Sequence, residues 1–245
     1  MKKILVILLV AVVLLAGCAK ADKTPAAVNP VDIVKATIEA FNSGDTEKGL
    51  SFLADDFVLL QDPPGVKVEG KAQYEATLKE AVKWHRQYLT TSQYHVDGDK
   101  VSFTAEISSD EFRIIGLDSI DASFEVQVRD GKIVSITAKP DSNDWNKIVE
   151  LSSGGIGISI QFNKEGALVE KLAENSPASE AGIKPGDIIT AVDGVNYPQM
   201  REGELPLRIR GKVGSKVLLT VLREGATNPV DIEVTRVDMS QLIWP

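Results

Sequence analysis

The chain has 245 residues and a mass of 26.5 kDa, which is enough for one or two globular domains. Hydrophobic residues make up 43% and charged residues 25% of the chain, which disfavours both a disordered protein and a multi-span membrane protein. The formal net charge of −8 argues against nucleic-acid binding, because nucleic-acid-binding proteins carry a basic face. One cysteine cannot build an internal disulfide framework or a thiolate zinc cluster, and two histidines specify no metal site.

Residues 1–17 have the layout of a cleaved secretory signal. A basic start is followed by thirteen apolar residues, 4–16, fewer than the ~20 that span a bilayer. This run ends in Leu15-Ala16-Gly17-Cys18, which resembles a bacterial lipobox. The resemblance implies cleavage before Cys18 and attachment of acyl chains such as palmitate to that cysteine, and an ordinary signal peptide is the alternative. Residues 18–30 are small and polar with two prolines, which predicts a tether.

Residues 31–140 predict a first domain of α+β class, with helices followed by strands. Apolar residues three and four positions apart indicate helices at 31–41, 46–53 and 71–88. Alternating apolar residues between turn signals indicate strands at 57–60, 91–96, 101–107, 111–115, 122–128 and 132–138. Three helices and a curved antiparallel sheet give a cone-shaped fold, and we call residues 31–140 the cone domain. It holds 12 Lys and Arg against 19 Asp and Glu, a net charge of −7.

The cone domain contains four characteristic short segments, Ala40-Phe-Asn-Ser-Gly-Asp45, Leu53-Ala-Asp-Asp-Phe-Val58, Val68-Glu-Gly-Lys71 and Asp130-Gly-Lys-Ile-Val134. With these segments it resembles the nuclear-transport-factor-2-like superfamily, which includes ketosteroid isomerases, polyketide cyclases and non-enzymatic binding domains. Isomerase chemistry requires a carboxylate base and two oxyanion donors. In this chain the position of the tyrosine donor holds Thr37, the position of the base holds Gln61, and Asp121 lies two residues from the position of the second donor. We therefore expect no catalytic residues here, and we take Thr37, Gln61, His85 and Asp121 as the candidate polar lining of a cone pocket.

Residues 141–153 form the expected linker, with a short helix at 145–151 whose N-cap is Ser142 or Asn143. Residues 154–237 predict a second, nearly neutral domain with 10 basic and 11 acidic residues, and residues 238–245 form a tail. Two motifs, Gly155-Ile-Gly-Ile158 and Ser176-Pro-Ala-Ser-Glu-Ala-Gly-Ile-Lys-Pro-Gly-Asp-Ile-Ile189, resemble the PDZ domains of C-terminal processing peptidases and high-temperature-requirement proteases. The resemblance implies a β-barrel-like domain with short helices.

The PDZ resemblance also implies a peptide-binding groove. Gly155, Ile156, Gly157 and Ile158 would present backbone N–H groups to a terminal carboxylate, and Ser159 and Ile160 would pair with the peptide backbone. Leu205 and Ile209, four residues apart, would line the helix on the far side of the groove. Gly203 and Pro206 depart from the family pattern, because proline inside a helix costs ~3 kcal/mol. We expect this helix to begin at Pro206 and the groove to be shallow.

The sequence contains neither a Ser/Lys domain after the PDZ segment nor a His/Asp/Ser domain before it. The prediction is therefore a non-catalytic extracytoplasmic lipoprotein, without cofactor, that is anchored to a bacterial cell membrane or outer membrane. Its partners would be protein C-termini or exposed strands, with no nucleic acid. Two alternatives stay open. One is a cone domain that binds or transforms a small molecule, with the PDZ domain for docking, and the other is a homodimer formed through the cone domain.

Overall fold

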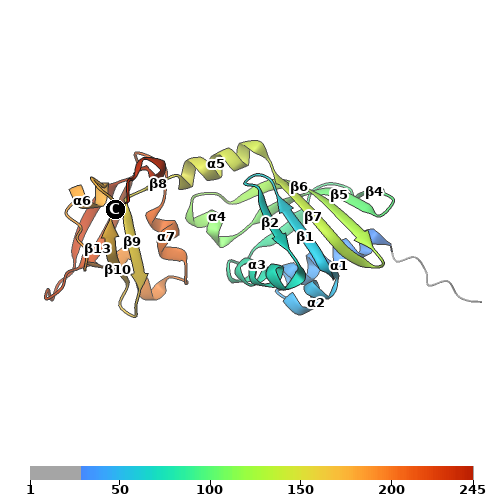
Figure 1. The fold of residues 1–245 in the computed structure, drawn as a ribbon, viewed down its shortest axis with the longest axis horizontal. Helices are drawn as coiled ribbons and strands as arrows, with labels where there is room; N and C mark the ends of the chain where they lie inside the picture. Colours follow the sequence, from blue (N-terminus) through green and yellow to red (C-terminus); the bar gives the residue numbers. More distant parts are fainter. Residues whose placement is uncertain (1–28, 245) are drawn as a thin grey trace, which may run out of the picture.

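The structure, a computed structural model, describes residues 29–244 as two domains joined by helix α5 (Figure 1). Cys18 and the expected signal segment lie outside the described residues. Among residues 29–244, no helix is long and apolar enough to cross a bilayer.

The cone domain is built on a curved sheet with strand order β2-β1-β7-β6-β5-β3, and β4 pairs with β5. Its strands are β1 (Leu53–Gln61), β2 (Val66–Glu69), β3 (Gln87–Thr90), β4 (His95–Asp97), β5 (Lys100–Ser108), β6 (Ser119–Arg129) and β7 (Lys132–Pro140). Neighbours are antiparallel except β1 and β7, which run parallel. The expectation of a wholly antiparallel sheet is wrong for this pair, because β1 and β7 are far apart in sequence and no turn signal connects them.

Four helices belong to the cone domain: α1 (Pro30–Asn42), α2 (Thr46–Ser51), α3 (Lys71–Lys83) and α4 (Asp110–Ile114). Helix α1 begins where the Asn29 side chain accepts a hydrogen bond from the N–H of Val31, and Pro30 is its first residue. Helix α4 replaces the strand expected at 111–115. The Ser109 hydroxyl accepts from the N–H of Phe112, and two acids occupy the first helical turn, where the helix dipole favours negative charge.

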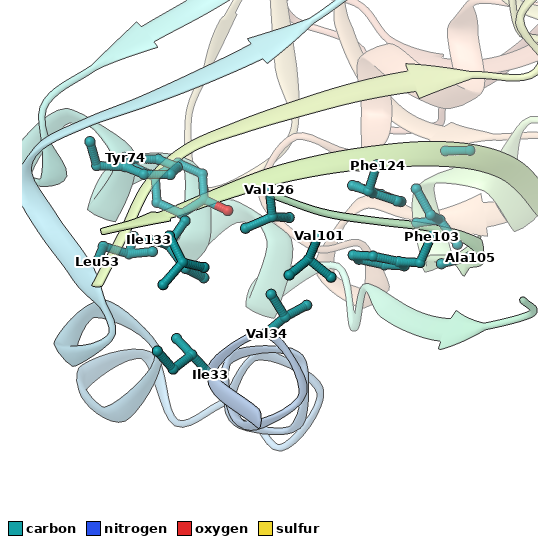
Figure 2. Packing of buried hydrophobic residues seen from close by; sticks show 14 of the residues in the cluster. Ile33, Val34, Leu53, Tyr74, Val101, Phe103, Ala105, Phe124, Val126 and Ile133 are labelled. Carbon is teal, nitrogen blue, oxygen red and sulfur yellow. The ribbon is translucent and has the colours of Figure 1, made fainter. Parts of the chain in front are cut away.

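One face of the sheet and the inner faces of α1 and α3 enclose an apolar core (Figure 2). Strands β5 and β6 alternate buried and exposed positions along their length, as the sequence predicts. At their centre the rings of Phe103 and Phe124 stack, with centroids 5.1 Å apart. On the other side Phe57 packs against Tyr74 at 4.9 Å, so aromatic contacts run across the whole core.

Helix α5 (Ser142–Ser152) connects the domains. Its N-cap is Asp141, one residue before the expected positions, and its carboxylate accepts from the N–H groups of Asn143 and Asp144.

The second domain is an open sheet rather than a closed barrel, with strand order β14-β13-β11-β10-β9. Strand β12 pairs with β11, and β15 pairs with β8. Its strands are β8 (Gly154–Gly155), β9 (Ile158–Phe162), β10 (Ala167–Leu172), β11 (Ile188–Val192), β12 (Val195–Asn196), β13 (Lys216–Leu222), β14 (Val230–Thr235) and β15 (Val237–Asp238). Its helical segments are α6 (Pro177–Glu180), η1 (Tyr197–Gln199), α7 (Glu204–Ile209) and η2 (Met239–Gln241).

Helix α7 begins at Glu204, two residues before the expected start. Gly203 precedes it in a left-handed conformation, with φ +87°. Pro206 is the third helical residue, where a backbone N–H has no acceptor within the helix in any case. Neither residue therefore breaks the helix.

The two domains meet where α4 packs beside α7 (Figure 1). Asp110, the first residue of α4, forms an ion pair with Arg201 of the second domain and a hydrogen bond with Nδ1 of His85 at 2.8 Å. Arg201 also lies over the ring of Trp84, 6.0 Å from its centroid. Asp110 is therefore the polar centre of the contact between the domains.

We expect the substitution Asp110→Asn to weaken this contact by about 1 kcal/mol, because it removes a charge-assisted hydrogen bond. Hydrogen bonding from Arg201, helped by His85, lowers the pKa of Asp110 below its ordinary value. A lowered carboxylate pKa stabilises the folded contact above the ordinary value of about 3.9, and this stability is lost as the pH falls through the lowered pKa. Small-angle scattering should therefore show a more open particle for the variant at neutral pH, and for the unsubstituted chain only under strong acid.

The matched control is Asp56→Asn, because exposed Asp56 pairs with Arg129 within the cone domain. Scattering curves of Asp110→Asn that superimpose on those of the unsubstituted chain would contradict the prediction.

Candidate functional site

The Gly155–Ile158 loop is held in place through its carbonyl groups, while two of its N–H groups stay unused. The carbonyl of Ile156 accepts from the N–H of Ala178 at 3.0 Å, and that of Gly157 accepts from Ala173 at 2.9 Å. Within residues 29–244, no acceptor receives a hydrogen bond from the N–H of Ile156 or of Gly157. Adjacent free N–H groups in a rigid loop form a site for an anion such as a carboxylate.

The C-terminal tail packs against this loop. Strand β15 pairs with β8, and the N–H of Glu174 donates to the carbonyl of Ile243 at 2.9 Å. A Cβ atom on Gly155 would lie 2.7 Å from the side chain of Met239, and one on Gly157 would lie 3.2 Å from that of Leu242. The glycines therefore allow the tail to approach closely, in addition to any role in binding.

Strand β9 starts directly after the loop and lies at the edge of the sheet. Among the described residues it pairs only with β10, so its other edge carries unpaired backbone groups. Ser159 and Ile160, the two residues expected to pair with a peptide, lie within this strand and are half-buried. The edge is therefore available for strand addition.

The two side chains expected on the far wall are buried. Leu205 and Ile209 are 1% and 5% exposed and belong to the domain core, so little of their surface is left for a ligand. At the distal end of β9, Phe162 stacks on Tyr197 with nearly parallel rings 6.3 Å apart. Phe162 is 47% exposed, and sequence reasoning missed this pair because 35 residues separate its members.

A second candidate site is a cavity of about 400 Å³ in the cone domain, which lies in the size range of small-molecule sites. Thr37 and Gln61 line it, as expected. The hydroxyl of Thr37, however, donates to the carbonyl of Ile33 at 2.8 Å and is already used. His85 and Asp121 lie outside the cavity: His85 is exposed beside Asp110, and Asp121 is exposed on β6.

The cavity contains a polar cluster that sequence reasoning missed. Arg86 and Glu111 form an ion pair at 2.6 Å, and both line the cavity together with Tyr74 and Tyr88. Burial alone would lower the pKa of Arg86, but Tyr88 and Glu111 outweigh it and raise that pKa, so the guanidinium stays charged. The Nε atom of Arg86 is buried and has no hydrogen-bond partner among the described residues.

Tyr74 adds a neutral donor to this cluster. Figure 2 shows its hydroxyl directed inward among the core residues. Burial raises the pKa of Tyr74 far above its ordinary value, so the hydroxyl remains protonated at neutral pH. In the part of the chain that the structure describes, no group of three or more His, Cys, Asp or Glu side chains is placed to hold a metal ion.

We expect Gly157→Ala to destabilise the second domain more than Gly182→Ala. Both glycines have positive φ, +76° and +85°, which costs an L-residue about 1–2 kcal/mol. A Cβ atom on Gly157 would also lie 2.5 Å from the Cβ of Ser176, whereas one on Gly182 would meet nothing within 4 Å. This overlap should add about 1–3 kcal/mol to the loss in a urea titration. Equal losses for the two variants would contradict a tightly packed loop.

Comparison with known proteins assigns both domains. The SnoaL-like domain family matches residues 34–136, and the PDZ domain family matches residues 154–234. A carboxyl-terminal-processing protease of Synechocystis is 38% identical over 84 residues, which are 34% of this chain and 20% of that protein. A probable periplasmic serine endoprotease DegP-like of Pseudomonas putida is 34% identical over 106 residues, 38% of this chain and 22% of that protein. The match thus spans about a fifth of these relatives.

Among solved structures, an NTF2-like protein of unknown function from Cytophaga hutchinsonii covers 50% of this chain and 98% of its own length, with 17% identity and a TM-score of 0.41. By the two family matches, the chain contains a SnoaL-like domain followed by a PDZ domain, and it is similar over 84 residues to a carboxyl-terminal-processing protease.

Proposed function

We propose that this protein is a non-catalytic, lipid-anchored adaptor of the bacterial cell envelope. Its PDZ domain binds the C-terminal end, or an exposed strand, of another protein. The observation that carries the proposal is the unpaired edge of β9 next to the free N–H groups of Ile156 and Gly157. A peptide added to this edge gains backbone hydrogen bonds along its length, and its carboxylate gains charge-assisted bonds in the loop.

The side chains of β9 supply selectivity. Ile158 and Ile160 point to the same side of the strand and are half-buried against the domain core. The far helix contributes little open apolar surface, since Leu205 and Ile209 are core residues. An open strand edge of this kind favours peptides that bind through their backbone and terminal carboxylate, with one or two apolar side chains near the end.

The relatives support a peptide-binding role for the second domain. Their similarity to this chain covers a stretch of about the size of the PDZ domain, while the other half of this chain is a SnoaL-like domain. Placement in the cell envelope is supported by the lipobox resemblance ending at Cys18, and by a relative whose name includes the word periplasmic.

A second candidate function is small-molecule binding in the cone domain, with the PDZ domain for docking. The cavity of about 400 Å³ favours it, because a core filled by its own side chains would leave no such space. Glu111 is the one acidic residue among those that line the cavity, and it is paired with Arg86. This pairing favours binding over proton abstraction, since a general base must be free to accept a proton.

Calorimetry with an apolar C-terminal octapeptide tests the main proposal. We expect saturable binding that weakens at least tenfold when the peptide carboxylate is replaced by an amide, because the loop bonds are charge-assisted. Ile160→Ala should weaken binding, since it removes apolar surface beside the open edge of β9 while the backbone pairing with β10 stays in place. The matched control Gln161→Ala changes the exposed side and should preserve binding. Equal affinity for acid and amide would overturn carboxylate recognition.

Membrane fractionation with a radiolabelled fatty acid tests the anchor. Cys18→Ser should abolish label incorporation and release the protein from the membrane fraction, because acyl chains contribute ~0.8 kcal/mol per buried CH₂. Ala21→Ser, three residues further along, is the control and should stay labelled. Unchanged labelling of Cys18→Ser would rule out the lipobox.

A further inference from the structure

The cone cavity is not closed by the cone domain alone. Trp145, Ile148 and Ser152 of α5 line it, and so do Leu207 and Arg210 of the second domain. Figure 1 shows α5 bridging the domains, with α4 and α7 facing each other beside it. The mouth of the cavity is therefore a composite of both domains.

Arg210 lies where this cavity adjoins a second pocket. It lines the apolar cavity and also a neighbouring polar pocket of about 270 Å³. The charged residues of that pocket are Arg208, Arg210, Lys212, Arg236 and a single acid, Asp193. Positive charge therefore gathers at the point where the two spaces meet.

Most of these cations already have partners. Arg208 pairs with Glu204, and Lys212 pairs with Glu150, each at 2.6 Å. Arg210 is exposed and has no ion-pair partner among residues 29–244. Its guanidinium is free to meet an anion.

Arg236 strengthens the local positive potential and fixes its position. Its guanidinium is buried and donates to the carbonyls of Arg208, Ile209 and Lys216, at 2.6 to 2.9 Å. These bonds hold the end of α7, the segment that carries Arg210. Among the described residues no carboxylate forms an ion pair with Arg236, and Asp193, which lines the same pocket, offsets only part of the positive charge gathered there.

The inside of the cavity has the opposite character. Its lining is mostly apolar, Arg86 and Glu111 neutralise each other, and Tyr74 is uncharged. An anionic group would be poorly compensated there, because a buried charge needs a partner. At the mouth it would find Arg210 and partial exposure to water.

We propose that the cavity and its mouth form one site for an amphiphilic carboxylate, whose apolar body fills the cone and whose carboxylate binds Arg210. The proposal rests on the second candidate function and names the chemical class of the ligand. A volume of about 400 Å³ is well above the roughly 150 Å³ that holds benzene, so the cavity takes a medium-length chain or a fused ring system. The second domain thereby supplies the residue that selects an acid over a neutral ligand.

Titration with decanoate and with 1-decanol tests the proposal on the folded chain. Binding is followed by calorimetry and by the fluorescence of Trp145, which lines the cavity. We expect decanoate to bind about tenfold more tightly than decanol, and Arg210→Gln to remove this difference while decanol binding stays within twofold. Arg129→Gln, an exposed arginine on the cone domain, is the matched control and should leave both affinities unchanged.

The outcomes distinguish the carboxylate site from small-molecule binding in the cone. If both ligands bind equally to the unsubstituted chain, or if Arg210→Gln leaves the difference intact, the carboxylate site is overturned while small-molecule binding in the cone stands. If neither ligand binds, both fail. Ala138→Phe, which fills the cavity from β7, should abolish binding of both ligands, and retained binding would place the site elsewhere and overturn the proposal.

Discussion

Packing of the short helix α7 between two domains is the constraint that links the PDZ core to the cone cavity. Leu205 and Ile209 anchor it in the PDZ core, while Leu207 and Arg210 line the mouth of the cone cavity. Because α7 has only six residues, any movement of one face also moves the other. Gly203 makes this placement possible, since a left-handed residue at φ +87° turns the chain into the helix beside Trp84. The departure from the family pattern at this position therefore serves the junction between the domains.

The charges at the junction between the domains differ from what the net charge of each domain suggests. The cone domain carries a net charge of −7 and the second domain only −1, which suggests an acidic and a neutral half. The structure shows that the neutral half is polarised instead, because Arg201, Arg208, Arg210, Lys212 and Arg236 gather toward the junction. Acids of the first half and the linker, Asp110 and Glu150, pair with two of them. Charges that cancel in a sum can therefore still build a local site.

Local sequence signals predicted the structure well wherever a short segment determines it. The alternation of Val101, Phe103, Ala105 and Ile107 places these residues in the core, and Ser176-Pro177 begins α6 as its cap and first residue. Predictions failed where distant segments decide. The strand expected at 111–115 is a helix, and the parallel pairing of β1 with β7 has no local signature. The ion pair of Arg86 and Glu111 could not be found for the same reason. Its members are 25 residues apart in the sequence, and Glu111 lies in a helix where a strand was expected.

The Gly155–Ile158 motif illustrates why a sequence pattern alone does not decide between a scaffold and a binding site. Gly155 and Gly157 have structural reasons to be glycine, since Met239, Leu242 and Ser176 would overlap a Cβ atom at one or the other position. A scaffold without affinity for peptides would keep both residues. What distinguishes a binding loop is where its polar groups point, and here the carbonyls of Ile156 and Gly157 are satisfied while the N–H groups of the same two residues are not. Unsatisfied donors cost free energy unless water or a ligand meets them. Their position beside the open edge of β9 therefore supports a binding role for the motif, which its glycines alone do not.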